Sequence, residues 1–69
     1  MSEIKLNSEY IKLGQALKAS GLAASGVEAK IVIQNGEVTV NGNVCTERGR
    51  KLYDGDVVHY NGETINIMK

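Results

Sequence analysis

Residues 37–44 read Glu-Val-Thr-Val-Asn-Gly-Asn-Val, and residues 57–67 read Val-Val-His-Tyr-Asn-Gly-Glu-Thr-Ile-Asn-Ile. In both stretches apolar and polar residues alternate around an Asn-Gly pair, the dipeptide that best tolerates the two positive φ angles of a type I′ turn. Each stretch is therefore predicted to form a β-hairpin. The side chains expected on the buried side of the second hairpin are Val58, Tyr60, Ile65 and Ile67.

The first third of the chain has the pattern of a short strand followed by a helix. Residues 4–6 alternate between apolar and polar and are predicted to form an edge strand. Ser8 is a suitable N-cap, and Gly21 supplies the left-handed residue that often follows a helix. We therefore predict a helix between Ser8 and Gly21. Its apolar face is expected to contain Tyr10, Leu13 and Leu17.

A second helix is predicted after a tight turn, because an S-x-x-E capping box begins at Ser25. An Asn-Gly pair is expected to end this helix. Val27 and Ile31 are four residues apart, and neighbouring apolar residues widen the same arc. We therefore expect the helix to be largely buried, with Val27 and Ile31 in its apolar face and with Lys30 and Gln34 facing solvent.

The chain of 69 residues contains eight Lys+Arg and eight Asp+Glu, so its formal net charge is zero. This length corresponds to one small domain, residues 1–69, and no apolar run approaches the ~20 residues of a membrane helix. We expect a soluble protein of the cytoplasm. A neutral chain lacks the overall positive field that attracts polyanions, so any contact with nucleic acid must come from a local patch.

No group of residues has the pattern of a catalytic or cofactor site. Cys45 and His59 are each the only residue of their type, which excludes an internal disulfide framework and a cysteine-based zinc site. The glycines fit no phosphate-binding pattern, and Asp54 and Asp56 have no second acidic pair beside them. The sequence predicts no catalytic residue, no metal ion and no cofactor, and an enzyme is the class that it supports least.

Arg48-Gly49-Arg50-Lys51 places three cations within four residues of a predicted loop. Such a run is commonly a solvated loop, but a basic loop that contains glycine can also approach a phosphate backbone closely. The second interpretation gains weight if Lys18 and Lys30, on the two helices, lie on the same surface. The three tyrosines could stack on unpaired bases, but their spacing favours positions in the core or at its rim.

One family shares this combined pattern. The residues that carry the match, in chain order, are Leu13, Leu17-Lys18, Gly21, Ser25-Gly26, Ala29-Lys30, Gly36, Val38, Val40-Asn41-Gly42, Arg48, Arg50-Lys51-Leu52, Gly55-Asp56 and Val58. In this order they resemble the RNA-binding domain first named for ribosomal protein four of the small subunit, which we call the S-four domain. The resemblance is closest to its small stand-alone bacterial members, the YaaA/YbcJ-like proteins, and extends from Ile4 to Ile67.

The resemblance implies an α+β fold in which two N-terminal helices pack on a small, twisted, mostly antiparallel sheet, the αL motif. It also implies a non-catalytic module that binds structured RNA, either rRNA or another translation-related RNA, through the start of the second helix and a nearby basic loop. The partners that it implies besides RNA are the ribosome or other translation proteins. Carried over residue by residue, it nominates as RNA-binding Lys18, Ser25, Gly26, Lys30, Asn41, Gly42, Arg48, Arg50 and Lys51.

The chain departs from the family pattern at three positions. Gly26 stands where many members carry Arg, Val27 where close relatives often carry a second Gly, and Glu47 where they often carry Arg. These departures imply a weaker cationic surface. The alternative function is a protein-interaction module of the same fold whose basic loop docks an acidic protein, and we expect a monomer in either case.

Overall fold

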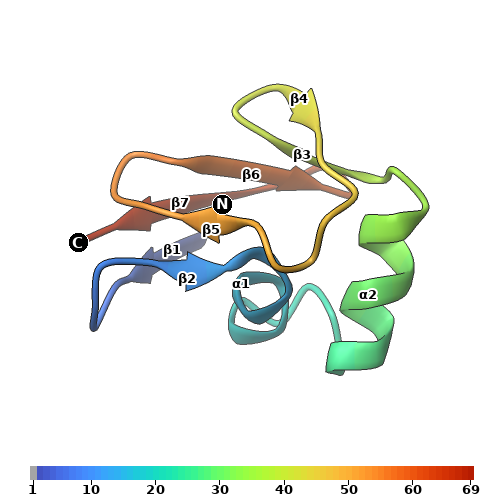
Figure 1. Cartoon of the computed structure of the whole chain (residues 1–69), viewed down its shortest axis with the longest axis horizontal. Coiled ribbons are helices and arrows are strands. Elements are labelled where there is room, and N and C mark those ends of the chain that lie inside the picture. The colour runs from blue at the N-terminus through green and yellow to red at the C-terminus, as the bar shows by residue number, and fades with distance from the viewer. Residues whose placement is uncertain (1) are drawn as a thin grey trace.

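The computed structural model describes residues 2–69, which fill a volume of about 28 × 22 × 20 Å. Two short strands come first, two helices follow, and five strands complete the chain (Figure 1). The elements are β1 (Ser2–Lys5), β2 (Ile11–Lys12), α1 (Leu13–Ala19), α2 (Gly26–Gln34), β3 (Val38–Val40), β4 (Asn43–Val44), β5 (Lys51–Leu52), β6 (Val57–Tyr60) and β7 (Glu63–Met68). The helices therefore lie in the N-terminal half, but strands precede them.

The main sheet has five strands in the order β1-β7-β6-β3-β4. Strand β1 pairs with β7 in parallel, and the other pairs are antiparallel, so the sheet is mixed rather than purely antiparallel. The predicted edge strand at residues 4–6 corresponds to β1, which does lie at an edge. A separate antiparallel ribbon of β2 and β5, which the sequence did not predict, pairs Ile11 with Leu52 and Lys12 with Lys51.

Both predicted hairpins are confirmed. β3 turns into β4 through Asn41 and Gly42, whose φ angles are 52° and 86°. β6 turns into β7 through Asn61 and Gly62, with φ angles of 52° and 78°. Two successive positive φ angles define the type I′ turn that the Asn-Gly pairs predict.

The first helix begins four residues later than predicted, at Leu13 with Lys12 as its N-cap residue, so the expected N-cap role of Ser8 is wrong. Residues 11–12 extend to pair with β5, and this tertiary pairing prevents the helix from starting earlier. Tyr10 consequently lies outside the helix and is 36% exposed. The predicted C-terminus is confirmed, because Ser20 is the C-cap and Gly21 follows with a φ of 81°.

The capped start of α2 is confirmed, because the backbone N–H of Glu28 donates to Ser25 Oγ at 3.2 Å. The predicted burial of Val27 and Ile31 is wrong, since they are 68% and 52% exposed. The buried residues of the helix are Ala29, Val32 and Ile33. At 100° per residue these three form one narrow stripe, and Val27 and Ile31 project from the opposite side of the helix.

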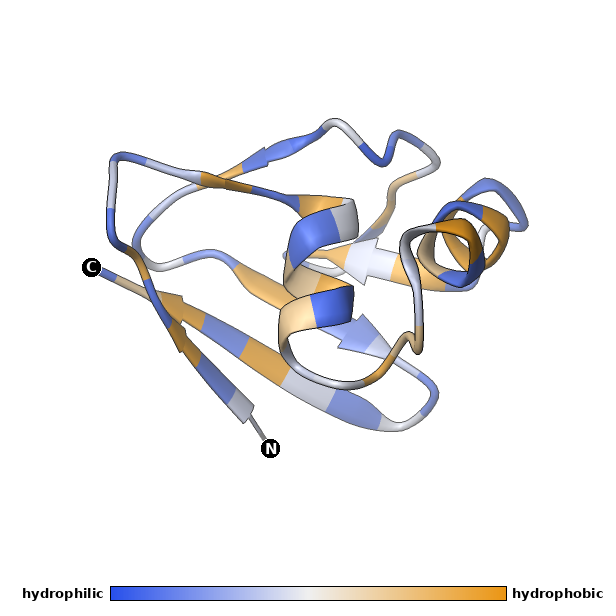
Figure 2. Cartoon of the chain, turned by 90° about the horizontal axis from the view of Figure 1, so that it is seen from below, coloured by the Kyte–Doolittle hydropathy of each residue, from blue (hydrophilic) through white to orange (hydrophobic). Residues whose placement is uncertain are grey.

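Figure 2, seen from below, shows α1 in front of the strands of the main sheet and α2 beside them at one end, and residues of both helices and of the sheet share one core. The largest fully buried side chains are Leu13, Leu17, Ile33, Leu52, Ile65, Ile67, Val38, Val40 and Val58. In the second hairpin Val58, Ile65 and Ile67 are buried as predicted, while Tyr60 is half-buried against the core. Within residues 2–69, neither helix has the length and apolar character needed to cross a membrane.

Candidate nucleic-acid interface

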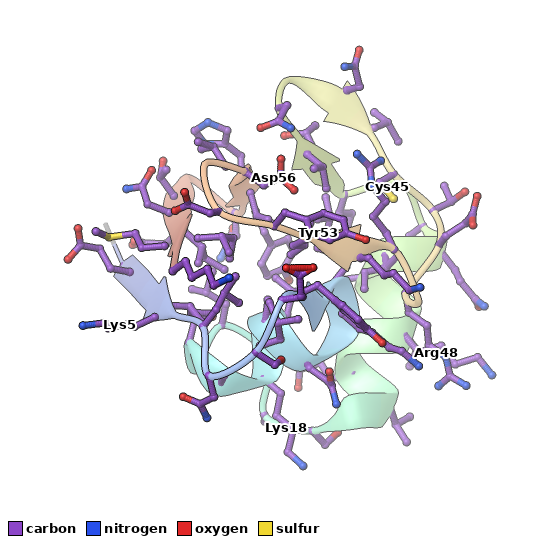
Figure 3. All side chains as sticks on the ribbon, turned by 60° about the vertical axis from the view of Figure 1, so that its left-hand side comes forward. Lys5, Lys18, Cys45, Arg48, Tyr53 and Asp56 are labelled. Carbon is purple, nitrogen blue, oxygen red and sulfur yellow. The ribbon has the colours of Figure 1, made fainter. Side chains whose placement is uncertain are left out.

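A depression of about 410 Å³ lies where the two helices meet the loop that follows β4. Its lining consists of Lys12, Gly14, Gln15, Lys18, Gly26, Arg48 and Gly49. We call it the cation depression, because three of its seven lining residues are basic and none is acidic. Figure 3 shows Lys18 and Arg48 projecting from neighbouring parts of the surface, whereas Lys5 projects from the other side of the molecule.

Backbone hydrogen bonds hold the basic loop against the start of α1. The N–H of Leu13 donates to the carbonyl of Arg50 at 2.8 Å, and the N–H of Gly14 donates to the carbonyl of Arg48 at 3.0 Å. A Cβ atom at position 14 would lie 3.5 Å from both Arg48 Cβ and the Arg48 carbonyl oxygen, which is ordinary van der Waals contact, so the loop backbone lies close against the start of α1. The loop that the sequence identified by its charge is thus fixed beside both helices.

The cations of the depression have no acidic partners in the part of the chain that the structure describes. No carboxylate lies within 4.0 Å of Lys12, Lys18 or Arg48, whereas an exposed pair elsewhere joins Lys69 and Glu9 at 3.8 Å. Lys12 also stands directly opposite Lys51 in the β2–β5 ribbon. Like charges at opposed positions destabilise a sheet, so an anion bound here would relieve a repulsion that the fold leaves in place.

Helix α2 starts at the same depression, which Gly26 lines. The side chain of Ser25 caps the helix and is therefore engaged in a structural role. Lys30 is exposed one turn after Gly26, on the same side of the helix but outside the lining. Amides at the start of a helix favour phosphate, which adds to the attraction of the cations.

The remaining nominated residues lie outside the depression. Arg50 and Lys51 are exposed next to it, and Lys51 places its Nζ atom 4.9 Å from the centroid of the Tyr10 ring. Asn41 and Gly42 form the β3–β4 turn, at the top of Figure 1, away from both helices. The amide of Asn41 donates to Asp56 Oδ1 at 3.0 Å, and its oxygen accepts from the backbone N–H of Val57 at 2.9 Å. Asn41 therefore has a clear structural task.

Sequence reasoning missed Lys12 and Gln15 as members of this surface. The helix predicted between Ser8 and Gly21 contains Lys12 away from its apolar face, where nothing in the sequence connects this residue to the basic loop. The register of the β2–β5 ribbon is what brings it to the depression, and two-residue strands leave almost no periodic signal in a sequence. Gln15 is held by the backbone N–H of Lys12, which donates to its Oε1 atom at 3.3 Å.

The described residues contain no group of three or more His, Cys, Asp or Glu side chains that could hold a metal ion. Cys45 is buried and lies 3.7 Å from the carbonyl oxygen of Glu47, and His59 contacts the Thr64 hydroxyl at 3.0 Å on the polar face of the sheet. The chemistry that the surface offers is therefore the binding of anions.

Comparison with known proteins identifies the family of the chain. The family model of the S4 domain, called the S-four domain above, matches residues 4–68, so the chain belongs to this family. It is 46% identical over 59 residues to the Bacillus subtilis protein named "Probable ribosome maturation protein RlbA", covering 86% of this chain and 83% of that one. It is 34% identical over 59 residues to YbcJ of Escherichia coli K12, covering 86% and 84%.

Two solved structures are also similar. The solution structure of Escherichia coli YbcJ, described as having an αL motif involved in RNA binding, matches with a TM-score of 0.77 and 31% identity over all of this chain and 89% of that one. The 30S ribosomal protein S4e of Thermoplasma acidophilum matches with a TM-score of 0.70 and 25% identity over 84% of this chain and 31% of that chain. The α+β fold with two helices, a mixed sheet and the αL motif is confirmed, whereas the placement of the helices at the N-terminus is not, because β1 and β2 precede them.

Proposed function

We propose that this protein is a non-catalytic module that binds structured RNA, an rRNA or another translation-related RNA, in the cytoplasm. The phosphate backbone lies over the cation depression, where Lys12, Lys18 and Arg48 contact it from three different elements. The start of α2 and the exposed Lys30 extend this contact, and Arg50 and Lys51 extend it along the loop.

The observation that carries the proposal is the convergence of unpaired cations from β2, α1 and the loop after β4 on one depression. A basic loop that is merely solvated does not require cations from other elements beside it, whereas binding of a phosphate backbone requires several cations on one surface. The names of the relatives, which include ribosome maturation and an RNA-binding motif, support the same function. Because the chain is neutral overall, we expect modest affinity with a modest dependence on salt.

Fluorescence anisotropy with a labelled rRNA-like stem-loop tests this proposal, using Arg48→Glu and Lys69→Glu as a matched pair. Both variants change the net charge equally, but only Arg48 lines the depression. We expect Arg48→Glu to weaken binding by about tenfold or more and to reduce the slope of log K against log salt by about 0.7 to 0.9. Lys69→Glu should stay within about twofold of the parent, since Lys69 lines neither this depression nor the one beside Tyr10 and the change removes no direct phosphate contact.

Equal weakening by both variants would contradict the placement of the site. Absence of RNA binding at low salt, with the fold intact by circular dichroism, would contradict the function itself. It would favour the alternative in which the basic loop docks an acidic protein.

A further inference from the structure

An exposed aromatic pair lies at the open end of the β2–β5 ribbon, beside the cation depression. Tyr10 and Tyr53 are 36% and 46% exposed, and their ring centroids are 6.0 Å apart with the planes inclined by 51°. Tyr60, in contrast, packs against the core. The expectation that tyrosines lie in the core or at its rim therefore fits Tyr60 but does not account for this pair.

The pair is held by the backbone rather than by core packing. Tyr10 immediately precedes β2 and Tyr53 immediately follows β5, and the two strands are joined by the pairing of Ile11 with Leu52. The N–H of Tyr53 donates to Asp56 Oδ2 at 2.8 Å, and the N–H of Asp56 donates to the Tyr53 carbonyl oxygen at 3.0 Å. The backbone that carries both rings is thus fixed before a ligand binds, which lowers the entropy lost on binding.

The aromatic pair is continuous with the cation depression. Gln15 lines both that depression and a second one of about 300 Å³ that includes Tyr10. The ammonium of Lys51 lies 4.9 Å from the centroid of the Tyr10 ring. Lys51 is also the direct cross-strand neighbour of Lys12, which lines the cation depression. A chain of phosphates bound at Lys12 can therefore continue past Lys51 to the two rings.

We propose that Tyr10 and Tyr53 form a stacking platform for an unpaired nucleotide adjacent to the structured RNA, with Lys51 binding its phosphate; this rests on the proposed function. Exposed aromatic rings bind bases by stacking on their π faces, with little preference for sequence. A duplex keeps its bases stacked internally, so only an unpaired nucleotide can use the platform. The preferred ligand is therefore a helix with a single-stranded extension rather than a blunt hairpin.

Two RNAs that differ only in this feature test the inference: a blunt stem-loop and the same stem-loop with a four-nucleotide unpaired extension. Because stacking of one base on an aromatic side chain contributes about 1–3 kcal/mol, we expect the parent to bind the extended RNA at least about fivefold more tightly. Tyr53→Ala and Tyr10→Ala should each reduce this gain while leaving the affinity for the blunt RNA within about twofold. Tyr53→Phe should keep the gain, since the ring remains.

A 2-aminopurine base in the extension provides a second measurement on the unmodified protein, and its fluorescence should be quenched on binding through stacking. Equal affinity of the parent for the two RNAs, or a gain that survives in the Tyr10→Ala/Tyr53→Ala double variant, would overturn the inference while leaving RNA binding at the depression intact. Failure of the parent to bind either RNA would overturn the proposed function and the platform with it.

Discussion

Gly14 and Gly26 both line the cation depression, but a side chain would have different surroundings at the two positions. At position 14 a Cβ atom would be in ordinary van der Waals contact with Arg48, 3.5 Å away, so the neighbouring loop leaves room for little more than a methyl group in that direction. At position 26 a Cβ atom would meet nothing within 4 Å, and the φ angle is not in the positive region that favours glycine. The position where many S-four domains carry Arg is therefore open to a larger residue.

We predict that Gly26→Arg strengthens RNA binding, because it adds a cation at the edge of the depression without a steric conflict. Anisotropy at several salt concentrations should show about fivefold or tighter affinity and a slope of log K against log salt that is steeper by about 0.7 to 0.9. Gly26→Ala is the control for the change in helix propensity. Equal effects of the Arg and Ala substitutions would show that a charge at this position does not reach the RNA.

Asn41 and Asn61 occupy the same position in the two hairpin turns, each with a φ of 52°. Of these two side chains, within residues 2–69, only that of Asn41 forms hydrogen bonds, to the Asp56 carboxylate and to the backbone N–H of Val57. Asn41→Gly keeps the turn conformation accessible and removes these two bonds. We therefore predict that Asn41→Gly lowers the free energy of unfolding by about 1–3 kcal/mol more than Asn61→Gly, as measured by urea denaturation. A smaller loss for Asn41→Gly than for Asn61→Gly would contradict the structural role assigned to Asn41.

At the scale of elements, the hairpins were predictable because Asn-Gly turns and two-residue periodicity are local signals. The first residue of α1 and the buried side of α2 were less predictable, because tertiary contacts determine both. The pairing of Ile11 with Leu52 takes residues out of the first helix, and the packing of α2 on a single stripe leaves Val27 and Ile31 exposed. An apolar residue in a short helix does not by itself show which side faces the core.

Ile31 and Ile33 provide a direct comparison within α2, because they are 52% and 0% exposed. Ile33→Val removes a buried methylene-sized volume and should lower the free energy of unfolding by about 0.5–1.5 kcal/mol. Ile31→Val makes the same chemical change on the solvent side and should cost no more than about 0.5 kcal/mol. Chemical denaturation of both variants checks this, and a larger loss at Ile31 would mean that α2 packs through its other face.

At the scale of the whole molecule, the function of the surface depends on bringing together residues that are distant in sequence. The basic loop could be recognised from its composition and from the family resemblance. The contribution of Lys12 could not, because it depends on the ribbon between β2 and β5, and the aromatic pair depends on the same ribbon. The nominated Asn41 and Gly42, in contrast, lie in a turn outside the depression.

The most direct test of the central claim is to map RNA contacts on the folded protein by NMR, following the backbone amides of the 15N-labelled chain as a stem-loop RNA is added. We predict that the largest shifts occur at residues 12–18, at Gly26 and at residues 48–51, around the cation depression. Amides on the polar face of the sheet, such as those of His59 and Asn66, should change little. Shifts concentrated on that face or in the β3–β4 turn, with residues 12–18 and 48–51 unaffected, would contradict the account.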